Sequence, residues 1–105
     1  MIPDRYLAHL DGTLGKIQLA RRDPVAAVAE FEAERSHRMP DRDAGGDAVL
    51  DAFYGRALIE AQRDRARGVA LVTSAYKTLR ADDRADEERT DLERWMRAHG
   101  VPVPR

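Results

Sequence analysis

The chain contains an internal repeat that restricts the folds it can adopt. The tetrapeptide at positions 14–17 (Leu-Gly-Lys-Ile) has a counterpart at positions 54–57 (Tyr-Gly-Arg-Ala), forty residues later. In each copy the glycine lies inside a predicted helix, and a polar turn and a second amphipathic helix follow. A glycine inside a helix costs about 1 kcal/mol relative to alanine. Two glycines at matching places therefore predict two helix pairs whose members pack closely.

The second helix of each pair supplies a small and a larger residue at corresponding places. These residues are Ala27 and Phe31 in the first copy, and Gly68 and Val72 in the second. They follow the glycine by 12 and 16 residues in the first copy and by 13 and 17 in the second. The second copy therefore has one extra residue in its turn.

Apolar spacing predicts five helices, over about residues 3–22, 24–37, 47–62, 68–81 and 83–99. Asp23 and Pro24 form a typical helix start, Asp47 is expected to cap the third helix, and Gly100 is a natural stop. Residues 63–67 are predicted to be a polar turn. The first helix carries an apolar face, and the second is expected to point three apolar residues inward and most of its charges outward. The apolar face of the first helix consists of Leu7, Leu10, Leu14 and Ile17. In the second helix, the residues expected to point inward are Val25, Val28 and Phe31, and those expected to point mostly outward are Glu30, Glu32, Glu34 and Arg35.

Composition supports an all-α fold in one domain. No β-type alternation of useful length occurs, and the 105 residues include no cysteine, which excludes disulfides, thiolate metal sites and a cysteine nucleophile. No apolar stretch is long enough to span a membrane. We expect one domain over residues 1–100, with repeat one at about 3–38, a loop at 39–46, repeat two at about 47–81, a capping helix at about 83–99 and a proline-rich tail at 101–105. The predicted architecture is two antiparallel helical hairpins in a right-handed stack, with the fifth helix as a cap.

The repeat resembles the tetratricopeptide repeat, in which a helix pair packs through such small and large positions. The residues that carry the resemblance are Leu14, Gly15, Ala27, Phe31 and Pro40 in the first copy, and Tyr54, Gly55, Gly68 and Val72 in the second. The second copy departs from the pattern, because Tyr54 replaces leucine, Gly68 replaces alanine and Val72 replaces the aromatic residue. The resemblance implies a helical-repeat fold and a role in binding other proteins.

Residues 47–99 also look like the helical-repeat tails of large bacterial serine/threonine kinases and related myxobacterial regulators. The corresponding motifs are Gly-Arg-Ala-Leu at 55–58, Arg-Asp-Arg-Ala at 63–66 and Leu-Glu-Arg-Trp at 92–95. No kinase domain is present, so the resemblance implies no kinase activity. It implies a bacterial, cytoplasmic protein, and one alternative is that the chain is the excised C-terminal tail of a larger signalling regulator.

Two repeats are few for a solenoid, since about three or more are usually needed for stability. The fifth helix is expected to cap the second repeat through Leu92, Trp95 and Met96. The first repeat has no such cap. We therefore predict self-association or partner docking at that end.

The tetratricopeptide resemblance implies a partner-binding groove lined by the first helix of each pair. The candidate groove residues are Gly12, Lys16, Leu19, Ala52, Arg56, Ile59 and Glu60. Lys16 and Arg56 would suit a peptide with an acidic side chain or a free carboxylate. The carboxylate-clamp proteins of this family also use an asparagine, and this chain has none. Ordinary solvated or internally paired charges are the competing interpretation.

A second function class is anion or nucleic-acid binding by Arg63, Arg65 and Arg67, which are predicted to lie near a helix N-terminus. Asp64 interrupts this run, no aromatic residues accompany it, and the net charge of the chain is −1. Nucleic acid is therefore not the expected partner.

The sequence predicts no metal, cofactor or catalytic site. A loop with Asp41, Asp43 and Asp47 is similar to a calcium loop, but Gly45 and Ala52 occupy two ligand positions. The three histidines lack ligand spacing, and we expect His99 to bond helix-end carbonyls. The predicted function is protein–protein interaction, as an adaptor, scaffold or assembly subunit.

Overall fold

The computed structural model of the chain describes residues 4–38 and 44–105. These residues form five α-helices and one short 3₁₀ turn. The elements are α1 (Asp4–Ala20), α2 (Pro24–Ser36), α3 (Ala44–Glu60), α4 (Arg65–Arg80), η1 (Asp83–Ala85) and α5 (Asp86–Ala98). No strand occurs within the described ranges, and the prediction of an all-α fold is confirmed.

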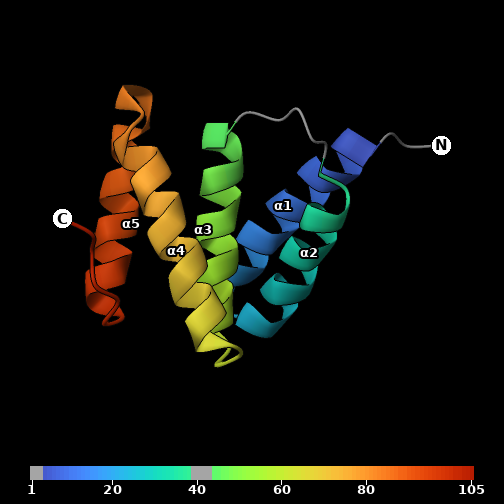
Figure 1. Cartoon of the computed structure of the whole chain (residues 1–105). Helices are drawn as coiled ribbons and strands as arrows, with labels where there is room; N and C mark the ends of the chain where they lie inside the picture. The colour runs from blue at the N-terminus through green and yellow to red at the C-terminus, as the bar shows by residue number, and fades with distance from the viewer. Residues whose placement is uncertain (1–3, 39–43) are drawn as a thin grey trace.

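The helices pair as two antiparallel hairpins followed by a single helix. α1 packs on α2, α3 packs on α4, and α5 lies against the side of α4 (Figure 1). The hairpins meet mainly where α2 contacts α3, and α1 also contacts α3. This is the expected arrangement of two helix pairs and a closing helix, while the handedness of the stack stays a prediction.

Two predicted helix ends are confirmed by their capping geometry. The carboxylate of Asp23 accepts a hydrogen bond from the backbone N–H of Ala26 at 3.1 Å, and Pro24 is the first residue of α2. Gly100 follows the end of α5 with a φ of +69°, a left-handed conformation that glycine adopts without strain. The chain therefore leaves α5 where its sequence indicates.

Two other helix starts differ from the prediction. α3 begins at Ala44, so Asp47 lies inside its first turn, where a carboxylate still favours the positive end of the helix dipole. α4 begins at Arg65, because the carboxylate of Asp64 caps it by accepting from the backbone N–H of Arg67 at 3.2 Å. The predicted turn at 63–67 is therefore wrong at its end, since Arg65 and Arg67 belong to the first turn of α4.

Close packing at the repeated glycines is confirmed in both helix pairs. A Cβ atom added to Gly15 would lie 2.7 Å from the ring of Phe31 in α2. Gly55 and Gly68 face each other across the second hairpin: a Cβ on Gly55 would lie 2.7 Å from the carbonyl oxygen of Gly68, and one on Gly68 would lie 2.8 Å from that of Gly55. The absence of side chains at these places lets the helix backbones approach each other.

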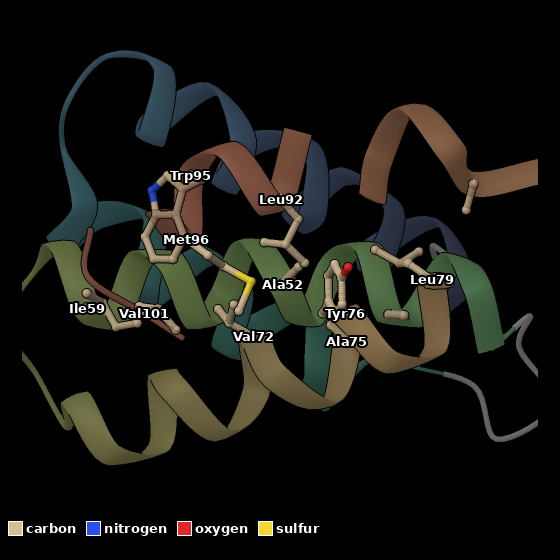
Figure 2. Packing of buried hydrophobic residues seen from close by; sticks show 12 residues of the cluster. Ala52, Ile59, Val72, Ala75, Tyr76, Leu79, Leu92, Trp95, Met96 and Val101 are labelled. Carbon is tan, nitrogen blue, oxygen red and sulfur yellow. The ribbon is translucent and has the colours of Figure 1, made fainter. Parts of the chain in front are cut away.

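The buried apolar residues form two clusters. One joins α2 to α3 around Phe31 and Tyr54. The other joins α3 and α4 to α5, and in it Met96 extends from α5 toward Val72 of α4 (Figure 2). Leu92, Trp95 and Met96 are buried in this second cluster, which confirms the predicted capping role of α5.

The outward and inward assignments for α2 are wrong at two positions. Val25, expected inside, is 47% exposed, because it lies in the first turn of α2 and away from the face formed by Val28 and Phe31. Glu34, expected outside, is only 1% exposed. A buried carboxylate needs partners, and Glu34 has one in the guanidinium of Arg38.

The charges around Glu34 connect the first hairpin to the second. The Nε of Arg38 donates to Glu34 at 2.8 Å, and its Nη2 lies 3.0 Å from the carboxylate of Asp51 in α3. Arg35 also donates to Asp51. The hydrogen bond from Arg38 to Glu34 is the largest cause that raises the pKa of Arg38. We call Glu34, Arg35, Arg38 and Asp51 the hairpin joint.

The glycine contact predicts a specific cost for Gly55→Ala. Alanine favours the helix by about 1 kcal/mol, but its Cβ would press on the Gly68 carbonyl oxygen, and overpacking costs about 1–3 kcal/mol. Because backbone atoms cannot rotate away, we expect the free energy of unfolding, measured with urea, to fall by about 2 kcal/mol. Gly12→Ala is the matched control, because its Cβ would lie 3.0 Å from the flexible end of Leu50 and in ordinary contact, at 3.6 Å, with the Cγ of Glu34, and would meet no backbone atom of a neighbouring helix. A Gly55→Ala protein as stable as the parent would contradict the packing described.

The hairpin joint predicts that Glu34→Ala lowers the free energy of unfolding by more than Gly55→Ala does. Removing one partner of a buried ion pair leaves the other charge uncompensated and costs about 3–5 kcal/mol. We expect a loss near the lower end, about 3 kcal/mol, because Arg38 also contacts Asp51. Glu30→Ala on the same helix is the control, with an expected change within about 0.5 kcal/mol. Equal effects of the two substitutions in urea unfolding would show that the joint does not stabilise the fold.

Candidate functional site

Two neighbouring hollows lie along α3 and form the candidate site. One, of about 280 Å³, lies between α1 and α3 and is lined by Gly12, Lys16 and Val49, among others. The other, of about 90 Å³, is lined by residues of α3 and α5 with Leu79 of α4, and it also includes Val49. We call the two hollows together the α3 groove.

Four of the seven predicted groove residues line these hollows. Gly12 and Lys16 line the first, and Ala52 and Arg56 line the second. The structure thus brings the two predicted cations to the same side of α3.

The other three predicted residues line neither hollow. Leu19 and Ile59 each follow a helix-contact glycine by four residues, so they share the face that packs inside the hairpin. Leu19 packs against the cluster around Phe31, and Ile59 is buried against Gly68. Glu60 is exposed at the last position of α3. Helical spacing from Lys16 and Arg56 alone does not distinguish residues that line the groove from residues that pack between the two helices of a hairpin.

Aromatic rings hold the two cations. The guanidinium carbon of Arg56 lies 5.0 Å from the ring centroid of Phe53 and 5.3 Å from that of Trp95. The Nζ of Lys16 lies 5.3 Å from the same Phe53 ring. Such cation–π contacts stabilise a positive charge that is partly removed from water. The ring of Phe53 therefore contacts the cationic groups of both Lys16 and Arg56.

Arg56 is a buried donor without a hydrogen-bond acceptor. Its Nε is enclosed and has no hydrogen-bond partner, and no carboxylate within the described ranges lies at ion-pair distance from its guanidinium. Burial lowers the pKa of Arg56, and the more distant charges of Glu60 and Asp91 act in the opposite direction. The side chain stays cationic, because the pKa of arginine starts so far above neutrality. The guanidinium of Arg56 is therefore partly removed from water and has no anionic partner in the described chain. The carboxylate of a bound partner would supply one.

The α5 wall of the groove is acidic. Glu88 and Asp91 line the second hollow together with Leu92. Asp91 accepts a hydrogen bond from Arg94 at 3.3 Å, so its charge is shared within α5. The groove therefore has a basic side on α1 and α3 and an acidic side on α5.

Sequence reasoning missed Phe53, Val49 and the two α5 carboxylates. Phe53 precedes Arg56 by three residues, so both lie on one face of α3, and this spacing was a usable signal. Nothing local in the sequence indicates that Glu88 and Asp91 face α3, because their position depends on how α5 packs on α4.

The three arginines of the alternative anion site, Arg63, Arg65 and Arg67, do not converge on one place. The carboxylate of Asp64 already occupies the N-terminus of α4. Arg65 extends toward the end of α5, where its Nη2 lies 3.5 Å from the carbonyl oxygen of His99, and Arg67 lies over the ring of Tyr54 at 5.3 Å. Arg63 is exposed in the turn. The three arginines thus point toward different elements.

Within residues 4–38 and 44–105, no three histidine or acidic residues gather in a way that could hold a metal ion. Asp41 and Asp43 of the loop similar to a calcium site lie outside the described residues. The Nδ1 of His99 lies 2.9 Å from the carbonyl oxygen of Trp95, which confirms the predicted helix-end contact. His37 instead pairs with Asp11 at 3.1 Å.

Among the described helices, none is both long and apolar enough to cross a membrane. Comparisons of the chain with protein-family models, with curated proteins and with solved structures found no match. The functional proposal below is therefore argued from the geometry of the α3 groove.

A hydrogen bond at the α4–α5 contact holds the α5 wall in place. The buried hydroxyl of Tyr76 in α4 donates to the carboxylate of Glu93 in α5. Arg89 also donates to Glu93, at 3.3 Å. The bond to Glu93, and then burial, raise the pKa of Tyr76. Ionised Tyr76 would face a like charge in the folded protein.

This contact predicts alkaline destabilisation. Because the pKa of Tyr76 is higher in the folded chain than in the unfolded one, its contribution is complete below about pH 10 and is lost as pH rises above that value. Urea unfolding between about pH 8 and pH 11 should show stability falling above pH 10. Tyr76→Phe should flatten this fall and lower stability by about 1–2 kcal/mol at neutral pH. Identical pH profiles for the two proteins would rule out this role for Tyr76.

Proposed function

We propose that this chain is a protein–protein interaction module, an adaptor or assembly subunit of a bacterial cytoplasm, that binds a peptide or partner helix in the α3 groove. The observation that carries the proposal is Arg56. Its guanidinium lies against Phe53 and Trp95 at the edge of a hollow, and its Nε has no acceptor. A carboxylate from a partner supplies the counter-charge that this guanidinium lacks within the described ranges.

The hollows along α3 have room for successive side chains of a peptide. One hollow beside Arg56 measures about 90 Å³, which suits one side chain, and a more open hollow that Arg56 lines together with Trp95 and His99 measures about 360 Å³. The hollow between α1 and α3 adjoins the smallest one at Val49, so successive side chains of one segment could occupy both.

The charges restrict which peptide would fit. Lys16 and Arg56 attract one carboxylate, whereas Glu88 and Asp91 on the opposite wall repel a run of acidic residues. A segment with a single acidic side chain or a terminal carboxylate, flanked by apolar or basic residues, matches both walls. The tetratricopeptide resemblance supports the same region, because α1 and α3 are the first helices of the two pairs.

Peptide binding tests the proposal directly. The chain has one tryptophan, Trp95, and it contacts Arg56, so its fluorescence reports on the groove. The probes are an array of short peptides that carry one acidic residue or a free C-terminus, each paired with its amide form. We expect binding of carboxylate forms, weakened about 30-fold by Arg56→Gln, since removing a buried charge partner costs about 2 kcal/mol or more.

Arg63→Gln is the matched control, because it removes the same charge from an exposed turn outside the groove. It should leave peptide affinity unchanged. No difference between carboxylate and amide peptides would refute the proposal, as would equal losses in the two variants. Oligonucleotide binding that weakens steeply with salt and is lost with Arg63→Gln would instead establish the alternative function.

A further inference from the structure

The outer face of α1 carries an apolar stripe that nothing in the described chain covers. Leu10, Leu14 and Ile17 are 51%, 42% and 43% exposed, and Leu7 is half-buried. Together with Val25 at the start of α2, the first three are the large apolar residues most exposed within the described ranges. We call Leu7, Leu10, Leu14 and Ile17 the α1 stripe.

The stripe is distinct from the face that α1 uses to fold. α1 packs on its neighbours through Gly12 and Gly15, which lie against Leu50 and Phe31. With about 100° of rotation per residue, these glycines lie on the side of the helix away from the stripe. α1 therefore contacts the fold through these glycines and Leu19, while Leu10, Leu14 and Ile17 lie in solvent. A helix with two apolar faces is suited to two sets of neighbours.

The spacing of the stripe matches a two-helix seam. Steps of three, four and three residues from Leu7 to Ile17 reproduce the apolar positions of a coiled-coil heptad. The partner that such a seam requires is a helix with the same pattern. This chain supplies that helix itself, so a symmetric pairing of two stripes is available without any other protein.

The rest of the described chain offers no second apolar patch for a head-to-tail contact. Beyond the first hairpin, no large apolar side chain in the described ranges is strongly exposed. α5, at the other end of the stack, turns Glu87, Arg94 and Arg97 to solvent. Within the described ranges, the stripe is therefore the main apolar surface that a second copy offers, and a stripe-to-stripe contact closes the assembly as a dimer.

Charge at the C-terminal end of α1 selects the direction of pairing. Arg21 and Arg22 follow the last residue of α1. Both arginines are exposed, and neither has an ion-pair partner within the described ranges. An antiparallel arrangement places the arginine pairs of the two copies at opposite ends of the seam, whereas a parallel one brings all four arginines together at one end.

We propose that the α1 stripe is the interface of an antiparallel, two-fold symmetric homodimer. In the matching register, Leu7 of one copy faces Ile17 of the second copy, and Leu10 faces Leu14. The seam runs along a helix of 17 residues, about 25 Å long. Standard interfaces bury about 800 Å² on each partner, and one short seam provides less, so the dimer dissociates in the micromolar range or above.

Sedimentation equilibrium of the whole chain, from about 5 µM to about 500 µM, tests the proposal. The average mass should rise from monomer to dimer and no further. Leu14→Lys should raise the dissociation constant at least tenfold, because it places a charge in the seam. His9→Lys is the control: it adds the same charge to an exposed position of α1 outside the stripe and should leave the dissociation constant unchanged. A monomer at every concentration, growth beyond a dimer, or equal effects of the two substitutions would overturn the proposal.

Cross-linking tests the direction of pairing, and the absence of native cysteine makes it specific. A mixture of Leu7→Cys and Ile17→Cys proteins treated with a short bis-maleimide should give cross-linked dimers. Each variant alone should give none, because ten residues of helix separate identical positions by about 15 Å in the antiparallel register. Efficient cross-linking of either variant alone would overturn the antiparallel arrangement. Circular dichroism of each variant confirms that it is folded.

Discussion

The buried carboxylate of Glu34 is the constraint on which the candidate site depends. It has to be paired, and Arg38 pairs it while also reaching Asp51 of the second hairpin. This arrangement fixes the end of α2 beside α3. Because α1 is packed on α2, the joint also decides how α1 lies against α3. The hollow between α1 and α3 adjoins its neighbour at Val49, so a charge buried outside the groove contributes to holding the groove walls in place.

Glycine determines the packing inside each hairpin and has a consequence for the surface. At Gly55 and Gly68 two backbones meet, and the contact leaves space on neither side for a side chain. In α1 the inward positions are Gly12, Gly15 and Leu19, and the four apolar residues of the α1 stripe lie on another face. The exposed stripe is therefore a direct result of how the first hairpin packs.

The sequence was sufficient for features that one helix or one pair determines. Apolar spacing predicted the helices, and the position of Gly15 and Gly55 predicted the close contacts. The sequence was not sufficient to predict the burial of residues where burial depends on which side of a helix packs on a neighbouring element. Glu34 was assigned outward because it is charged, although Arg38 four residues later was a signal of pairing. The acidic wall formed by Glu88 and Asp91 could not be predicted from the sequence, because its position depends on the packing of α5 on α4. The tetratricopeptide relation itself stays a prediction.

The groove and the stripe use different sides of one helix, and this separation has a functional consequence. Lys16 follows Leu14 by two residues, which is about 200° around the helix, so a partner on the stripe leaves the groove side of α1 open. A two-fold dimer would then present two open grooves at a fixed separation. A partner with two matching segments would bind both, and its second contact would be intramolecular. Linked binding of this kind can raise affinity by about 10²–10⁴ without any new contact. Self-association through α1 would thus give a small module with shallow hollows a way to hold its partner firmly.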